Sequence, residues 1–169
     1  MNTASLFSEA VSNRVRLSGH VGIVVPTSIA TDDSTKAFFT DLFVQHRIKS
    51  LIGFHNGEGL FPQVRPHQQF CLLTLGRNES EKAAFAFSLG STSELQNSER
   101  IFDLGLADLY LFNPNTGTCP VFTTATQMEL TRLLYRSAPV LIRESSPASN
   151  PWGLFFKQGL FNMATDSSL

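Results

Sequence analysis

The chain has 169 residues and a mass of 18.6 kDa, which is enough for one domain with a hydrophobic core but not for two complete domains. Its formal net charge of -1 at pH 7 gives no global attraction for a polyanion, so nucleic-acid binding would need a local basic or aromatic surface. Only 16% of the residues are charged and 15 are Phe, which predicts either an unusually large core or a partner surface that completes the chain.

The sequence carries no signal for a membrane. No apolar run approaches the roughly 18 residues of a span, and the first ten residues lack the basic start and long apolar stretch of a signal peptide. We therefore expect no membrane partner and a cytoplasmic protein. Cys71 and Cys119 have no second Cys or His at metal-ligand spacing, so we expect reduced, packed thiols and no metal site.

The first third of the chain alternates helical and extended patterns. Apolar residues recur at helical spacing between about residues 4 and 17, which predicts an amphipathic helix that ends at Ser18-Gly19. The run from Val21 to Val25 lacks polar alternation, which predicts a strand buried on both faces, as in a parallel sheet. Capping side chains at 31–34 precede a wide apolar helical face, so a second helix is expected over about 37–43.

Three further strands are expected, at Ile48 to Phe54, Phe70 to Leu75 and Ala83 to Leu89. The loop between the first two, His55 to Pro66, contains two Gly and two Pro residues, which fix its backbone without making it regular. A charged turn at 77–82 between the last two strands indicates an antiparallel hairpin. The order predicts an α/β sheet that ends in an antiparallel edge.

The character of the chain changes after about residue 90. A polar stretch is followed by short elements and then by a helix near Ala125 to Tyr135. The apolar face predicted for that helix comprises Met128, Leu130, Leu133, Leu134 and Tyr135. The tail from Ser145 is rich in Ser, Pro, Asn and Gly. We therefore divide the chain into an α/β region, residues 1–90, and a mostly helical or irregular region, residues 91–169.

Two short phrases resemble the gamma-class adenine-specific DNA methyltransferases of the bifunctional restriction-modification (type IIG) kind. Asn2-Thr-Ala-Ser-Leu6-Phe7 matches an Asn-x-x-x-Leu/Ala-Phe pattern on the helix before the strand at Val21. Gly57-Glu58-Gly59-Leu60-Phe61-Pro62 matches a Gly-Glu-x-Phe-Pro loop of that family, with one residue inserted. Residues 111–122 and 147–156 also resemble the segment that follows the catalytic domain in those enzymes.

The resemblance implies roles for two aromatic rings. Phe61, with Pro62 beside it, would stack on the target adenine flipped out of the duplex, and Phe7 would border the adenine of S-adenosylmethionine. From the residues alone, two other interpretations stay open. Phe7 could be an ordinary core residue of its helix, and Phe61 could fold back into the core from its turn.

Four other residues are candidates for the same site. Pro26 and Thr27 resemble the family's segment at the carboxyl end of a sheet strand, where we expect them to shape the floor of the pocket. Arg65 and His67 follow on the Phe61 loop and could reach a DNA phosphate, or be ordinary solvated side chains.

The chain lacks the other parts that the resemblance implies. It has no glycine-rich cofactor loop, no acidic ribose ligand and no Asn-Pro-Pro-aromatic tetrapeptide. Asn113-Pro114-Asn115-Thr116 is similar to that tetrapeptide, but its third and fourth residues differ, and we expect a turn. We therefore expect no catalytic residue, no binding of S-adenosylmethionine by this chain alone and no activity of the isolated chain.

Together these features predict the C-terminal half of a Rossmann-like methyltransferase sheet, residues 1–90, and a linker toward a target-recognition region, residues 91–169. The expected partners are DNA and either the missing N-terminal half of the domain or a second copy of the chain. The alternative is a non-catalytic interaction or DNA-binding module that pairs with a separately encoded protein. A generic α/β domain without a nucleic-acid role is a third possibility.

Overall fold

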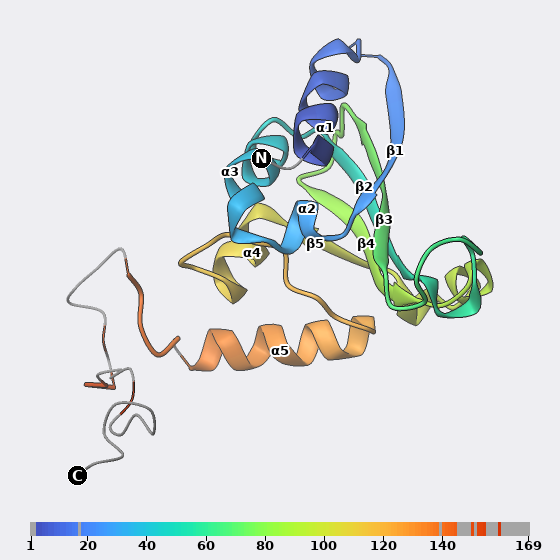
Figure 1. The fold of residues 1–169 in the computed structure, drawn as a ribbon. Helices are drawn as coiled ribbons and strands as arrows, with labels where there is room; N and C mark the ends of the chain where they lie inside the picture. The colour runs from blue at the N-terminus through green and yellow to red at the C-terminus, as the bar shows by residue number, and fades with distance from the viewer. Residues whose placement is uncertain are drawn as a thin grey trace, which may run out of the picture. The chain divides into compact units, whose positions relative to one another are not determined.

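The computed structural model describes residues 3–16, 18–138, 140–144, 150, 152–154 and 159. The chain divides into two compact units, residues 1–138 and 139–169, and the first contains the helices and strands described below (Figure 1). In chain order these are α1 (Thr3–Arg14), β1 (His20–Pro26), α2 (Ser28–Thr31), the 3-10 helix η1 (Asp33–Thr35), α3 (Lys36–Val44), β2 (Ile48–His55), η2 (Asn56–Glu58), β3 (Gln69–Gly76), β4 (Lys82–Leu89), η3 (Thr92–Gln96), η4 (Ser98–Arg100), β5 (Phe102–Gly105), α4 (Leu106–Phe112) and α5 (Ala125–Ser137).

Five strands form one mixed sheet in the order β1-β3-β2-β4-β5. Strand β3 is antiparallel to both β1 and β2, whereas β4 is parallel to β2 and antiparallel to β5. It follows that β1, β2 and β4 run in the same direction and that their carboxyl ends meet at one end of the sheet. The α/β fold class predicted from the sequence is confirmed.

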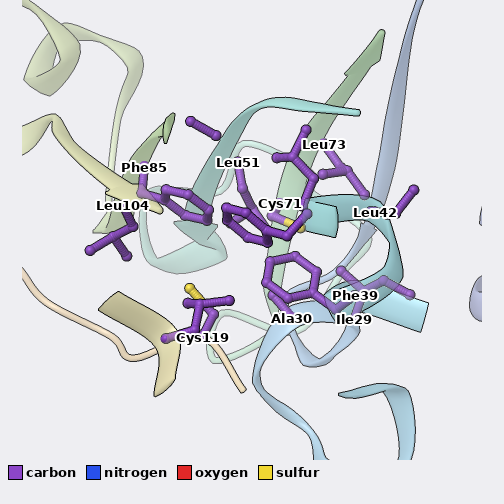
Figure 2. Packing of buried hydrophobic residues seen from close by; sticks show 14 of the residues in the cluster. Ile29, Ala30, Phe39, Leu42, Leu51, Cys71, Leu73, Phe85, Leu104 and Cys119 are labelled. Carbon is purple, nitrogen blue, oxygen red and sulfur yellow. The ribbon is translucent and has the colours of Figure 1, made fainter. Parts of the chain in front are cut away.

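One face of the sheet carries the main hydrophobic core. Ile23, Leu73, Leu51 and Phe85 lie in one row across four strands, and all are buried. Helices α2, α3, α4 and α5 place further buried side chains in the same cluster, among them Leu109 and Met128. Figure 2 shows Ile29 of α2 and Phe39 and Leu42 of α3 in this core. The wide apolar face predicted for residues 37–43 therefore packs on the sheet, as a helix that must bury such a face does.

The two cysteines belong to this core and form no disulfide. Burial raises the pKa of the Cys71 thiol to about 12, because a thiolate would lose its hydration there. Burial, and secondarily the neighbouring Cys71, raises the pKa of the Cys119 thiol well above its ordinary value. Both thiols are protonated at neutral pH and are expected to resist alkylation in the folded protein.

The opposite face of the sheet is covered at one end only. There the segment that contains η3 brings Leu95 and Ile101 against a small second cluster, Phe54, Ala86 and Leu89. Farther along the same face, Val24 of β1 and its register partner Leu72 of β3 remain exposed.

The prediction that residues 21–25 form a strand buried on both faces is wrong. Strand β1 is an edge strand, pairs antiparallel with β3, and alternates between buried and exposed positions. Val24 is 57% exposed. The prediction failed because Gly22 and Val24 lie on a part of the sheet face that no described element covers, so an apolar residue there is not buried within this chain.

The expected hairpin between residues 70–75 and 83–89 is also wrong, because β2 lies between β3 and β4. The antiparallel edge of the sheet consists instead of β1, β3 and β2. The turn that follows β3 is built across the start of β2: the side-chain amide of Asn78 donates to the carbonyl oxygens of Ile48, at 2.9 Å, and Lys82, at 2.8 Å. The charged turn therefore connects β3 to β4 across β2 and does not close a hairpin.

Helix α5 is apolar on two sides. Met128 is buried, the Tyr135 ring lies edge-to-face on Phe112 with centroids 5.6 Å apart, and Arg132 forms a 3.0 Å ion pair with Asp108 of α4. The other three residues of the predicted apolar face, Leu130, Leu133 and Leu134, are each at least 58% exposed. The apolar face predicted from spacing is therefore divided between the core and the surface. In the described part of the chain, no helix is long and apolar enough to cross a membrane.

The hydrophobic core continues past residue 90. Phe102 of β5 pairs with Phe85 of β4, and Leu104 is fully buried in the same core as the first four strands. The first compact unit continues to Ala138. The assignment of residues 1–90 to a methyltransferase part and of 91–169 to a linker stays a prediction about function, but the two regions share one sheet.

We expect Leu104→Ala to lower the free energy of unfolding by about 2–5 kcal/mol, because it leaves a cavity in a core that both regions build. Urea unfolding followed by circular dichroism measures the change. Leu130→Ala is the matched control, and its exposed side chain predicts a change below about 0.5 kcal/mol. Equal stability of Leu104→Ala and the unchanged protein would show that residues 1–90 fold without β5.

Candidate functional site

The carboxyl end of the sheet gathers most of the residues that the sequence singled out. Pro26, Phe70, Phe54 and Leu89 are register neighbours across four strands at this end. The loops that follow β1, β2 and β4 therefore begin side by side. Open α/β sheets bind ligands beyond the carboxyl ends of their strands. The structure thus brings the predicted pocket floor to the same end as the loop that carries Phe61.

The buried amide of Asn56 holds that loop in shape. Its side chain, 1% exposed, accepts a hydrogen bond from the Phe61 N–H at 2.8 Å and donates to the carbonyl oxygens of Phe61 at 2.9 Å and Val64 at 2.7 Å. Its backbone N–H donates to the Gln68 carbonyl at 3.0 Å. One side chain therefore satisfies three backbone groups of a loop that is otherwise exposed. Sequence reasoning missed Asn56, although an Asn before a glycine-rich loop is a recognisable signal for such bonds.

The first turn of the loop is fixed by its own residues. The Gly57 N–H donates to the Nδ1 atom of His55 at 3.1 Å, which also establishes that this nitrogen acts as the acceptor. Gly59 has a φ of 71°, the left-handed conformation that favours glycine, and its N–H donates to the Asn56 carbonyl at 3.0 Å. The two glycines of the predicted motif therefore serve the turn rather than a ligand.

Phe61 is anchored on the sheet and still open to solvent. Its ring lies edge-to-face on Phe70, with centroids 5.0 Å apart, and Phe70 stacks on Phe54 at 5.6 Å. The Phe61 side chain is 43% exposed, so it is not folded back into the core. A rigid, partly exposed ring is what base stacking needs, although that role stays a prediction.

The remaining candidates differ in their surroundings. Phe7 is 61% exposed, because α1 turns Ala4 and Val11, not Phe7, toward the core. Pro62, Arg65 and His67 are exposed on the Phe61 loop. Asn2 of the Phe7 pattern lies outside the described residues, as do residues 147–149, 151, 155 and 156 of the resembling tail segment.

Thr27 lies at the carboxyl end of β1 with its hydroxyl oxygen buried and without a hydrogen-bond partner among the described residues. A buried hydroxyl without a partner is uncommon, because it forfeits its hydration. The Thr27 carbonyl accepts from the Ala30 N–H at 3.1 Å, so its backbone is used by the turn into α2. Thr27, which the sequence placed at the pocket floor, thus has a hydroxyl group that no described residue binds.

The carboxylate of Glu94, on η3, is bound to the backbone. One carboxylate oxygen accepts from the Gly90 N–H at 2.7 Å and the Ser91 N–H at 3.3 Å, and the carboxylate pairs with Arg100 at 3.1 Å. These donors, first of all the Gly90 N–H, hold the pKa of Glu94 below its ordinary value. A carboxylate so occupied is a cap for η3, not a general base.

The segment Asn113 to Thr116 is a turn, as predicted. The side-chain amide of Asn113 donates to the Thr118 carbonyl at 2.9 Å, so it is committed to local structure. Within the described ranges, no three His, Cys, Asp or Glu side chains come together as a metal site. What this end of the sheet offers chemically is an aromatic platform on a stiff loop.

No family model matches the chain, and no curated protein matches it. Among solved structures, the chain is similar to part of one described as "Characterization and crystal structure of the type IIG restriction endonuclease BpuSI". The match has a TM-score of 0.45 and 19% sequence identity, and it covers 62% of this chain. It spans only 14% of that chain, so the portion matched is a small part of a larger enzyme.

We expect Asn56→Ala to free the loop from residue 57 to residue 68. The substitution removes three hydrogen bonds and leaves the backbone groups of Phe61 and Val64 without the Asn56 side-chain amide. It should therefore lower the free energy of unfolding by about 1–3 kcal/mol. Hydrogen exchange of the loop amides, the Phe61 N–H above all, should become faster. Asn97→Ala, which removes one exposed capping bond on η4, is the matched control and should leave this loop protected. Unchanged exchange in Asn56→Ala would contradict the role assigned to Asn56.

The Glu94 carboxylate makes stability depend on pH in a defined direction. Its pKa in the folded state lies below the ordinary value of 4.5, so its contribution is complete above about pH 4.5 and is lost as the pH falls through the folded-state pKa. The difference in urea midpoint between the unchanged protein and Glu94→Gln should therefore be largest near pH 7 and shrink below pH 4.5. A difference that grows on acidification would refute this assignment.

Proposed function

We propose that the chain is part of a site-specific DNA adenine-N6 methyltransferase of the restriction-modification type. The observation that carries the proposal is the loop held by Asn56, which presents Phe61 at the common carboxyl end of β1, β2 and β4. The sequence resemblance of the same loop supports it. Phe61, with Pro62, holds the flipped adenine, Arg65 and His67 contact nearby phosphate, and Pro26 and Thr27 form the pocket floor.

The described residues do not fit S-adenosylmethionine on their own. Phe7 offers an exposed ring to its adenine, but the chain has no glycine-rich loop and no acidic ribose ligand to hold the rest. When bound in the complete enzyme, the cofactor supplies the methyl group. The contribution of this chain is to bind and orient the acceptor base, and we expect no methyl transfer by the isolated chain.

A missing N-terminal half would complete the sheet. The outer edge of β1, along His20 to Pro26, pairs with no described strand, and the strand contains no Asp, Glu, Lys or Arg. Such an edge is a template for another strand. The exposed Val24 and Leu72 beside it would be covered at the same time. Without that half, the same edge favours association with a second copy.

A non-catalytic DNA-binding or interaction module is the second candidate. It is favoured by the absence of a catalytic tetrapeptide and by an aromatic loop that is ordered without any partner. The two candidates share the platform and differ in what pairs with β1. Co-expression with an upstream coding sequence that ends in an Asn-Pro-Pro-Tyr-type motif, followed by a methylation assay, distinguishes them.

We expect the isolated chain to bind a duplex with an extrahelical adenine more tightly than a fully paired duplex. Phe61→Ala should remove about 1–3 kcal/mol of stacking, which weakens binding about 5- to 150-fold. Fluorescence titration with a labelled duplex measures both affinities. Phe61→Tyr, which keeps the ring, should retain most of the preference for the extrahelical base.

Leu60→Ala is a matched control, because Leu60 is a neighbouring exposed apolar residue of the same loop. It should change neither affinity by more than a small factor. The stacking role is refuted if Phe61→Ala binds the extrahelical adenine as tightly as the unchanged protein does.

A further inference from the structure

A group of basic side chains lies at the end of the sheet opposite the Phe61 loop. We call it the amino-end cluster and define it as Arg16, Arg47, Lys49 and Arg77. Arg16 follows α1, Lys49 lies at the start of β2, and Arg77 directly follows β3. These positions are distant in sequence, and the sheet topology brings them together at the amino ends of β1 and β2.

The cluster lines two adjoining hollows that share Arg77. One is lined by Arg16, Arg47 and Arg77 with Val15 and Gln45. The other is lined by Lys49 and Arg77 with the polar residues Ser18, His20, Asn78, Glu79 and Ser80. Glu79 is the single acidic side chain that lines either hollow. The surface is therefore concave and carries four fixed positive charges against one negative charge.

The four basic side chains of this cluster are not paired with carboxylates of the described residues. Within the described part of the chain, none of the four forms an ion pair with an acidic side chain. Arg47 donates to the Ser12 carbonyl, which fixes it, whereas Arg16 and Arg77 form no side-chain hydrogen bond with a described residue. Asn78 ties the turn after Arg77 to β2, so the hollow has a stiff wall. The positive charges therefore line the two hollows and can bind an anion.

We propose that the amino-end cluster binds the phosphodiester backbone of duplex DNA. A chain with a net charge of -1 attracts a polyanion only through such a local surface. Two hollows that share one arginine suit successive phosphates better than one small anion, which would fill only one of them. The choice of DNA as the duplex rests on the proposed function, whereas the electrostatic surface does not.

The two ends of the sheet are compatible with one duplex. Strands of eight residues rise about 26 Å, which is the length of roughly eight base pairs. A duplex that runs alongside the sheet would reach both the Phe61 loop and the amino-end cluster. The cluster would then supply affinity without sequence preference, because phosphate contacts position the protein and carry no base information.

The test is a salt titration of binding to a labelled, fully paired duplex, measured by fluorescence anisotropy. Each phosphate contact contributes about 0.9 to the slope of log affinity against log salt. Arg77→Gln should lower that slope by about 1, and Arg16→Gln with Arg77→Gln by about 2. Glu79→Gln should tighten binding, because it removes the one opposing charge in the hollow.

Lys36→Gln is the matched control, since it changes the net charge equally at the start of α3 and should leave the slope unchanged. An equal slope for Arg77→Gln and Lys36→Gln would overturn the proposal. So would displacement of the duplex by inorganic phosphate at an equal phosphate concentration, which would mark a small-anion site. Phe61→Ala should not alter the slope, so a failure of base stacking and a failure of this cluster are separate results.

Discussion

The hydrogen bonds of one buried amide determine the shape of the loop at the carboxyl end of the sheet. Asn56 directly follows β2, and its side chain fixes both backbone groups of Phe61 and the carbonyl of Val64. Every residue from 57 to 69 is exposed, so apolar burial contributes little to the order of this loop. The position of Phe61 therefore follows from polar geometry, and the contact with Phe70 then sets the angle of the ring.

The exposed apolar surface of the sheet accounts for the low charge and high Phe content of the chain. Few charges and many Phe residues would suit a large closed core, yet the chain leaves Val24, Leu72 and three leucines of α5 substantially exposed. Large contiguous apolar surface is unfavourable for a protein that works alone. An unpaired edge strand and an uncovered sheet face occur together at β1, which is the arrangement expected where a sheet continues into another stretch of polypeptide.

Local patterns predicted the elements well and their pairing poorly. Apolar spacing and apolar runs predicted the ranges of α3 and the first four strands to within a few residues, whereas α1 ends at Arg14, before the predicted Ser18-Gly19, and the face that β1 buries was predicted wrongly. The insertion of β2 between β3 and β4 involves contacts between residues distant in sequence, such as the hydrogen bond from Asn78 to Ile48, which a local sequence pattern does not reveal. The sequence left the exposure of Phe61 open and carried a signal for Asn56 that was missed, whereas the gathering of Arg16, Lys49 and Arg77 could be seen only in the fold.

The distribution of charge differs between the two ends of the sheet. At the carboxyl end, Glu94 and Arg100 form an ion pair and also hydrogen-bond to backbone groups, so the charges of these two side chains offset each other. At the amino end, the cations of the cluster lack acidic partners among the described residues. An aromatic platform works best where a base can shed water without meeting strong charge, while backbone phosphates are held best by unpaired cations. In the proposed complex, a nucleic acid would therefore meet the Phe61 ring, with Arg65 and His67 on the same loop, at one end of the sheet and the cations of the amino-end cluster at the other.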